Sequence, residues 1–380
     1  MATFLFYDDK IINILVPEEK PSGGAAVQAY GWVRGLMEAG QQVYIMTNVS
    51  AGGTLKDSCN DLQLVPMYDP KKGVRWVRWF YYRLPYLYSK IKQLKPDYLY
   101  QGIPCWQSFV LGVICRQLHI SFILRISNDS LLDDRFFNRN SKGHKFLQRA
   151  GMKLADYILC QNNYQFDIVR KEFPSKKVIK ISNPVFINNN LPVVAATERK
   201  YIAWLGLYQY QKNLKGLYEI ATLLKHEQFR VAGKEAAHYD EETLYYIRKL
   251  GQLSNVKFVG FLSRQQVLPF LANATFLLNT SHYEGFSNTF LEAMTVGTPI
   301  MTSEKVNPDS IITKHKLGLV YSSPTNLQKQ YVELLPERYN ELSENVLQYV
   351  EQQHGYKPLA NKLLSILNSV ESATGVLELT

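Results

Sequence analysis

Short runs of β-branched and aromatic residues alternate with amphipathic helical stretches along this chain. Such alternation is typical of parallel sheets covered by helices on both faces. In the first half it predicts strands at 3–7, 43–47, 98–101, 121–126 and 157–161, and helices at 25–39 and 105–118. In the second half it predicts strands at 201–205, 229–232, 256–259, 274–279 and 299–302, and helices from Asn213 onward and at 241–250. The sequence therefore predicts an α/β fold with two doubly wound sheets.

The alternation pauses at 182–198, where two prolines and a run of asparagines occur. A chain of 380 residues exceeds the size at which a single core keeps growing, so we expect two domains. We place them at 1–184 and 185–355, with closing helices within 337–369. Because ligands bind at the carboxyl ends of the strands in open parallel sheets, we expect the active site in the cleft between the domains.

Composition and the N-terminus bear on location. The chain is 46% hydrophobic and 20% charged, which predicts an ordered protein. No basic leader is present, Asp8 and Asp9 follow the first short apolar run, and stretches such as 109–115 are shorter than the roughly 20 residues of a spanning helix. The cysteines, at 59, 105, 115 and 160, have neither zinc-site spacing nor disulfide density. We expect a cytoplasmic protein without a transmembrane segment, with reduced cysteines.

The segment SHYEGFSNTFLEAMTVGTPI, at 281–300, carries the sharpest chemical signal. Glu284 is predicted to end a strand and Glu292 to lie on the next helix, so both should face one cleft. A helix that begins near Ser287 and Asn288 offers backbone N–H groups to a phosphate. A carboxylate two turns into that helix can accept hydrogen bonds from ribose hydroxyls.

A second signal is the pair Gly23-Gly24, which precedes the helix predicted at 25–39. Backbone N–H groups and the positive end of the helix dipole at such a turn can bind a diphosphate. A tight turn without a ligand is the alternative, and the residues alone leave both open.

At these residues the sequence resembles the retaining glycosyltransferases of family 4, which have the GT-B fold of two Rossmann-like domains. The resemblance covers nearly the whole chain. It is carried by EGFSNTFLE at 284–292, Gly23-Gly24, Ser182-Asn183-Pro184, the strand-turn-helix at 205–212 and FVGFL at 258–262. It implies an acceptor domain at 1–184, completed by a last helix at about 356–380, and a nucleotide-sugar donor domain at 185–355.

The resemblance also implies roles for particular residues. Glu292 should bind the donor ribose, Glu284 the donor sugar, and Lys212 the diphosphate. Donor contacts are further expected from Gly23, Gly24, Gly285, Phe286, Ser287 and Asn288. The implied reaction is a retaining hexosyl transfer from a UDP- or GDP-linked sugar to a hydroxyl of a glycan or lipid-linked acceptor, as in bacterial surface polysaccharide synthesis. Hydrogen-bond donors that already point at the leaving phosphate lower the activation barrier of the transfer, so no metal or other cofactor is expected.

Two positions depart from the family pattern. Leu207 stands where an arginine normally joins Lys212 on the diphosphate, and Arg125 or another basic residue is the suggested substitute. Asn128 stands where many relatives carry a histidine near the sugar; it can hydrogen-bond a hydroxyl but cannot act as a general acid or base. These departures motivate one alternative, a non-catalytic GT-B partner protein. A second alternative keeps the fold and changes the chemistry: a sugar-nucleotide epimerase, which would act without an acceptor.

The net charge of +10 has one local concentration, at 71–95, where eight lysines and arginines occur without an acid. Residues Trp76, Phe80, Leu84, Leu87, Ile91 and Leu94 recur at helical spacing and are predicted to pack in the core. Pro85 should split the helix. The remaining cations and aromatics indicate either an anionic membrane surface or a solvated basic face. Nucleic acid is not expected, since no binding motif accompanies the charge.

Overall fold

The computed structural model describes residues 1–17, 23–48, 54–75, 77–132, 141–185, 187, 194–236 and 240–375. The chain divides into two compact units. Unit 1 comprises Met1–Pro184 together with Tyr356–Thr380, and unit 2 comprises Val185–Gly355. Within the described ranges no helix combines the length and the apolar character needed to cross a bilayer.

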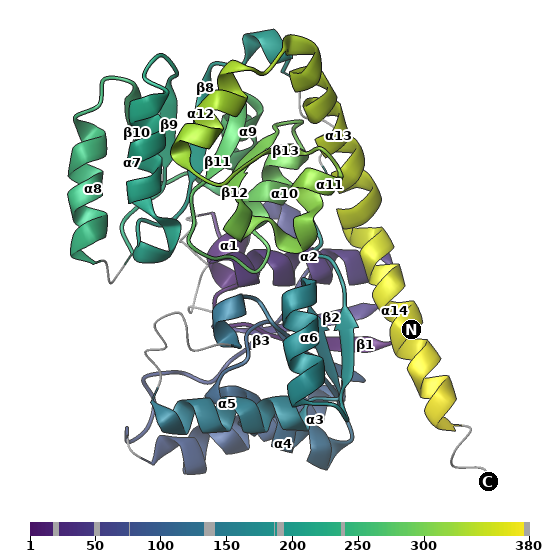
Figure 1. The fold of residues 1–380 in the computed structure, drawn as a ribbon. Coiled ribbons are helices and arrows are strands. Elements are labelled where there is room, and N and C mark those ends of the chain that lie inside the picture. The colour runs from purple at the N-terminus through teal and green to yellow at the C-terminus, as the bar shows by residue number, and fades with distance from the viewer. Residues whose placement is uncertain are drawn as a thin grey trace. The chain divides into compact units, whose positions relative to one another are not determined.

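Unit 1 is built on a seven-stranded parallel sheet with the order β3-β2-β1-β4-β5-β6-β7 (Figure 1). The strands are β1 (Thr3–Tyr7), β2 (Gln42–Thr47), β3 (Gln63–Pro66), β4 (Tyr98–Gln101), β5 (Ser121–Arg125), β6 (Tyr157–Cys160) and β7 (Lys177–Lys180). The central strands are apolar on both sides, because helices cover both faces of the sheet.

The helices of unit 1 form two layers. One face is covered by α1 (Ile12–Leu15), α2 (Gly24–Glu38) and α14 (Tyr356–Gly375). The other face is covered by the π-helix η2 (Trp79–Arg83) and by α3 (Leu84–Leu94), α4 (Trp106–Leu118), α5 (Lys142–Leu154) and α6 (Asn163–Glu172). Strand order reverses direction after β3, and right-handed crossovers therefore place the later helices on the opposite side from α2.

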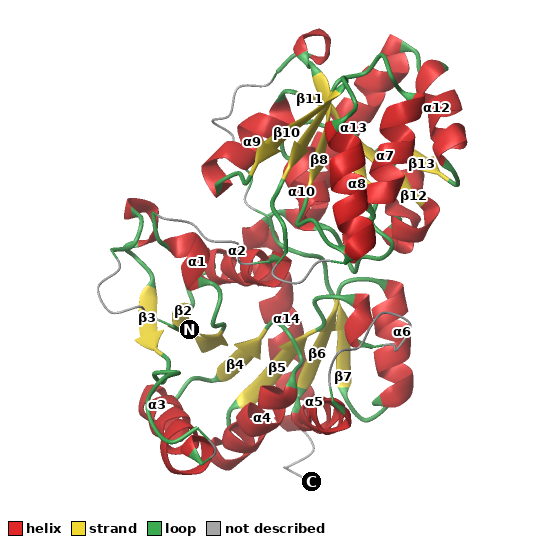
Figure 2. Ribbon diagram, turned by 90° about the vertical axis from the view of Figure 1, so that its left-hand side faces the viewer, coloured by secondary structure: helices red, strands yellow, loops and turns green. Residues whose placement is uncertain are grey.

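Unit 2 repeats this plan with a six-stranded parallel sheet, ordered β10-β9-β8-β11-β12-β13 (Figure 2). The strands are β8 (Tyr201–Leu205), β9 (Phe229–Ala232), β10 (Val256–Gly260), β11 (Ala274–Asn279), β12 (Ile300–Ser303) and β13 (Gly318–Tyr321). Its helices are α7 (Leu214–Leu223), α8 (Glu241–Gly251), α9 (Arg264–Ala272), α10 (Asn288–Met294), α11 (Ile311–Lys314), α12 (Pro324–Val332) and α13 (Pro336–His354). The predicted α/β fold with two doubly wound sheets is confirmed.

Three strands that the sequence did not reveal, β3, β7 and β13, each lie at the edge of a sheet. Each has only four residues, and β7 (KVIK) has exposed lysines at both ends. A short edge strand buries fewer apolar side chains than a central one, so it lacks the continuous apolar run by which the central strands were found.

The predicted core stripe at 76–94 is only partly right. Leu87 and Ile91 are buried, whereas Phe80 is 78% exposed and Leu84 is 36% exposed; Trp76 lies outside the described residues. The cause is the π-helix η2, which precedes α3 and shifts the register of the inward face. In this turn it is Arg83 that is buried instead.

Asp8 follows β1, and its Oδ1 accepts hydrogen bonds from the backbone N–H groups of Lys10 (2.8 Å) and Ile11 (3.0 Å). Burial raises the pKa of Asp8 from 3.8 to about 6. As the pH rises between these values the unfolded chain loses its proton first, so the carboxyl group increasingly destabilises the fold, and the penalty is complete above the folded pKa.

We therefore expect Asp8→Asn, which retains the acceptor oxygen, to raise the free energy of unfolding by about 2–3 kcal/mol at pH 8 and by almost nothing at pH 3. Urea unfolding at the two pH values measures this. Asp9→Asn, at an exposed neighbouring position, is the matched control. An equal gain from Asp8→Asn at both pH values would contradict the assignment.

Candidate active site

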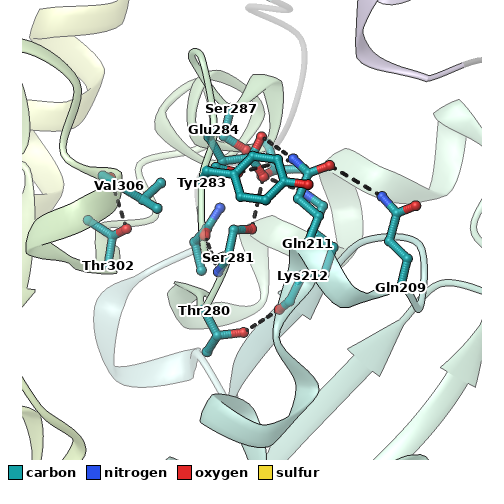
Figure 3. Close-up of polar contacts among 12 residues, drawn as sticks. Gln209, Gln211, Lys212, Thr280, Ser281, Tyr283, Glu284, Ser287, Thr302 and Val306 are labelled. Atoms are coloured by element: carbon teal, nitrogen blue, oxygen red, sulfur yellow. Dashed lines mark hydrogen bonds and ion pairs between the residues drawn. The ribbon is translucent and has the colours of Figure 1, made fainter. Parts of the chain in front are cut away.

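Lys212 and Glu284 are brought together at one edge of the unit 2 sheet. Lys212 ends a short 3-10 helix (Tyr210–Lys212) that follows β8, and Glu284 lies in the loop that follows β11. Strands β8 and β11 are parallel neighbours, so their carboxyl ends share an edge. The Lys212 Nζ lies 2.5 Å from the Glu284 Oε1 (Figure 3).

Neighbouring polar groups fix this pair in place. Ser281 Oγ donates to Glu284 Oε1 (2.9 Å), and Gln211 Nε2 donates to the carbonyl oxygen of Tyr283 (3.1 Å) (Figure 3). Thr280 Oγ1 donates to the backbone carbonyl of Lys212 (2.8 Å). Both charged groups therefore occupy defined positions before any ligand arrives, as electrostatic catalysis requires.

Glycine at 206 allows the lysine stem to pack closely. A Cβ atom there would lie 3.3 Å from both Cδ and Cε of Lys212. The pair nevertheless keeps some exposed surface, since the side chains of Lys212 and Glu284 are 16% and 11% exposed. Lys212 can thus contact a bound anion, and Glu284 can accept a hydrogen bond from a hydroxyl, in place of part of their interaction with each other.

Glu284 does not end a strand as predicted. Strand β11 ends at Asn279, whose Oδ1 accepts a hydrogen bond from the Ser281 N–H (2.9 Å) and turns the chain. Four further residues, 280–283, then lead to Glu284. The loop after β11 therefore positions the Glu284 carboxylate. For this reason the spacing of the predicted strands did not reveal its contact with Lys212.

Glu292 lies on α10, as predicted, with its side chain only 5% exposed. Its carboxylate forms a 2.5 Å ion pair with Nη1 of Arg264, the first residue of α9. Sequence reasoning missed Arg264. The available signal was the capping box of Ser263 and Gln266, which predicts a helix beginning at 264.

The residues directly before α10, from Gly285 to Ser287, are buried. The Phe286 side chain packs against Phe290 and His354 in the core of unit 2. Ser287, at the N-cap position, uses its hydroxyl to contact Thr289 Oγ1 (2.9 Å), and no side chain caps the helix. Any ligand contact from Phe286 must therefore come from its backbone. Gly285 is buried and Asn288 is half-buried beside it.

The remaining candidates lie in unit 1. Gly23 stands at the N-cap of α2 with φ 77°, a conformation that favours glycine, and no heavy atom lies within 4 Å of where its Cβ would be. Gly24 is the first residue of α2. Pro21 and Ser22, before them, are outside the described residues. Asn128 caps a 3-10 helix, its side chain accepting from the Ser130 N–H (3.0 Å).

Arg125 does not take the role suggested for it. Its guanidinium is fully buried at the end of β5, donates to Asn183 Oδ1 and to the carbonyl of Ile181 (3.3 Å), and stacks over Trp32. Burial lowers the pKa of Arg125. A side chain with no exposed surface cannot contact a diphosphate, so the idea that it replaces the arginine expected at Leu207 is wrong.

Comparison with solved structures identifies the fold class. The structure of Anabaena HepE in complex with UDP and glucose aligns with a TM-score of 0.73 over 97% of this chain and 100% of that one, at 13% identity. With its two doubly wound sheets the chain has the GT-B fold.

Sequence comparisons narrow the class. Residues 189–353 match the model of the glycosyl transferases group 1. The chain is 24% identical over 335 residues to an uncharacterized glycosyltransferase of Methanocaldococcus jannaschii, covering 80% of this chain and 82% of that relative. It is 30% identical over 178 residues to the lipopolysaccharide 1,6-galactosyltransferase of Salmonella typhimurium, covering 44% and 48% respectively. The resemblance to the group 1 glycosyltransferases is confirmed over residues 189–353, and the chain has the GT-B fold.

Proposed function

We propose that the protein transfers a hexosyl group, with retention of configuration, from a nucleoside diphosphate sugar to a hydroxyl of a glycan or lipid-linked acceptor. The observation that carries this proposal is the fixed, accessible pair of Lys212 and Glu284 at the carboxyl ends of β8 and β11. UDP is our first choice of nucleotide, since HepE is described in complex with UDP and glucose; GDP is the second. A role in surface polysaccharide synthesis is suggested by the lipopolysaccharide galactosyltransferase relative.

In the proposed mechanism the bond between the anomeric carbon and the β-phosphate oxygen breaks, and charge develops on that phosphate. Lys212 stabilises this charge, while Glu284 accepts hydrogen bonds from the sugar hydroxyls. The acceptor oxygen forms its bond on the face from which the phosphate departs, and the leaving phosphate takes the acceptor proton. Glu292 holds the ribose. We assign Asn128 a hydrogen bond to a sugar hydroxyl, and propose that no metal or other cofactor takes part.

In this proposal backbone N–H groups at Gly23 and Gly24 approach the diphosphate, and those at 285–288 meet the sugar or phosphate. We place the reaction in the cytoplasm, at an anionic membrane surface contacted through residues 71–95. Nucleic acid has no part in it.

The competing function is a non-catalytic GT-B partner protein. Two observations favour it. Leu207, which follows β8, carries no positive charge for the diphosphate, and Arg125 is buried and cannot supply that charge in its place. A sugar-nucleotide epimerase, which would need no acceptor, is the weaker alternative, because the segment around Glu284 and Glu292 fits the transferases better.

Titration of UDP, GDP and ADP into the full chain by calorimetry separates these functions. We expect one nucleotide, UDP first, to bind, and the corresponding nucleotide sugar to release it when an acceptor is added. Binding without release would favour the partner protein. No binding of any nucleotide at millimolar concentration to folded protein would refute the donor site.

A further inference from the structure

Four neighbouring elements of one helical layer of unit 1 lack acidic residues, while α6 at the end of that layer carries Asp167 and Glu172. Elements η2, α3, α4 and α5 contain no aspartate or glutamate at all. They carry the cations Arg83, Lys90, Lys92, Arg116, Lys142, Lys145, Arg149 and Lys153. Figures 1 and 2 both show α3, α4 and α5 together on the side of the sheet opposite α2. The basic character predicted for 71–95 thus extends, in three dimensions, to α5, which begins 47 residues after Lys95.

Large apolar side chains are exposed on the same layer. Phe80 is 78% exposed and Phe146, on α5, is 72% exposed. Val74 and Val77, just before η2, are 64% and 49% exposed. Burial of such side chains away from water is favourable, so several of them in one region indicate a surface that is covered when the protein works.

Aromatic contacts join the two segments. The Trp79 ring lies edge-on to Trp106 of α4, with centroids 4.6 Å apart, and Trp106 stacks on His144 of α5 at 6.4 Å. Trp106 therefore lies between η2 and the first turn of α5. Phe80 and Phe146 belong to the two elements that this aromatic row joins, Phe80 to η2 and Phe146 to α5.

We propose that this surface, defined by Lys71, Lys72, Val74, Val77, Phe80, Lys142 and Phe146, inserts its apolar side chains into an anionic lipid bilayer. Lysines beside exposed phenylalanine and valine match the two components of such a surface, negative headgroups and the acyl boundary below them. A nucleic acid would match the cations and the rings, but it offers nothing apolar for Val74 and Val77. The inference deepens the membrane contact within the proposed function and does not depend on catalysis.

The test is co-sedimentation of the full chain, without nucleotide, with vesicles of phosphatidylcholine alone or mixed with phosphatidylglycerol. We expect binding to the mixed vesicles only. Phe80→Ser combined with Phe146→Ser should weaken it at least tenfold. Lys71→Gln combined with Lys72→Gln should weaken it about thirtyfold. The matched control is Val332→Ser with Leu335→Ser, which removes apolar side chains that are 75% and 65% exposed on unit 2, and should change nothing.

Three results would overturn the proposal. The first is that the protein does not bind the mixed vesicles, or that the unit 2 control variant loses as much vesicle binding as the phenylalanine variant. The second is a dimer of the free protein that the phenylalanine substitutions dissociate. The third is binding of single-stranded RNA that needs the lysines but not the phenylalanines. Nucleotide titration of the same variants should give unchanged affinities, so failure at the membrane and failure at the donor site are distinguishable.

Discussion

Replacing Lys212 with glutamine should lower the rate of sugar transfer by about 10²–10³-fold while leaving the fold intact. The ammonium group lies near the carboxyl ends of β8 and β11, and Leu207 offers no charge to share its task. Its loss removes stabilisation of charge that develops only as the phosphate departs. The measurement is release of nucleotide from its sugar with acceptor present, at saturating donor, so that kcat is compared.

Lys215→Gln is the matched control, because Lys215 is an exposed lysine three residues further along the chain. It should retain the wild-type rate. Loss of the lysine also leaves the Glu284 carboxylate without its cation, which could perturb the loop. The double substitution Lys212→Gln with Glu284→Gln removes that unpaired charge; a wild-type rate in either variant would disprove the role assigned to Lys212.

Replacing Glu292 with alanine should raise the dissociation constant of the bound nucleotide about 10- to 100-fold. Its carboxylate is almost buried, and we propose that it accepts hydrogen bonds from both ribose hydroxyls. Calorimetry should compare UDP with its 2′,3′-dideoxy analogue, or the matching pair for whichever nucleotide binds. Wild-type protein should bind the analogue weakly, and Glu292→Ala should no longer distinguish the two.

Arg264→Met isolates the contribution of the ion pair, because it removes the partner of Glu292 and keeps the carboxylate. We expect this variant to keep its discrimination between the two nucleotides, with a smaller loss of affinity. If Glu292→Ala still prefers the ribose hydroxyls by the wild-type factor, the carboxylate does not bind them, and Glu292 serves only to join α9 to α10.

The central architecture could be predicted from the sequence because each central strand is an apolar run and apolar residues recur at helical spacing in the helices. Thus 3–7 and 274–279 coincide with β1 and β11. Edge strands such as β7 were missed because they pair with a neighbouring strand on one side only and contain fewer apolar residues than the central strands. The exposure of Phe80 was missed because a π-turn depends on local packing, which a constant 3.6-residue period cannot express.

For the site, the sequence by itself supplied candidates: Glu284 and Glu292 came from the segment at 281–300, and Lys212 came from the family resemblance. Only the tertiary structure decided their partners. The contacts from Lys212 to Glu284 and from Glu292 to Arg264 join residues 72 and 28 positions apart. It likewise decided that Arg125 is a core residue. The pattern of apolar residues along the chain shows which side chains each segment can bury. The pairing of charges depends on which segments meet in space, because parallel strands distant in sequence end at the same edge of a sheet.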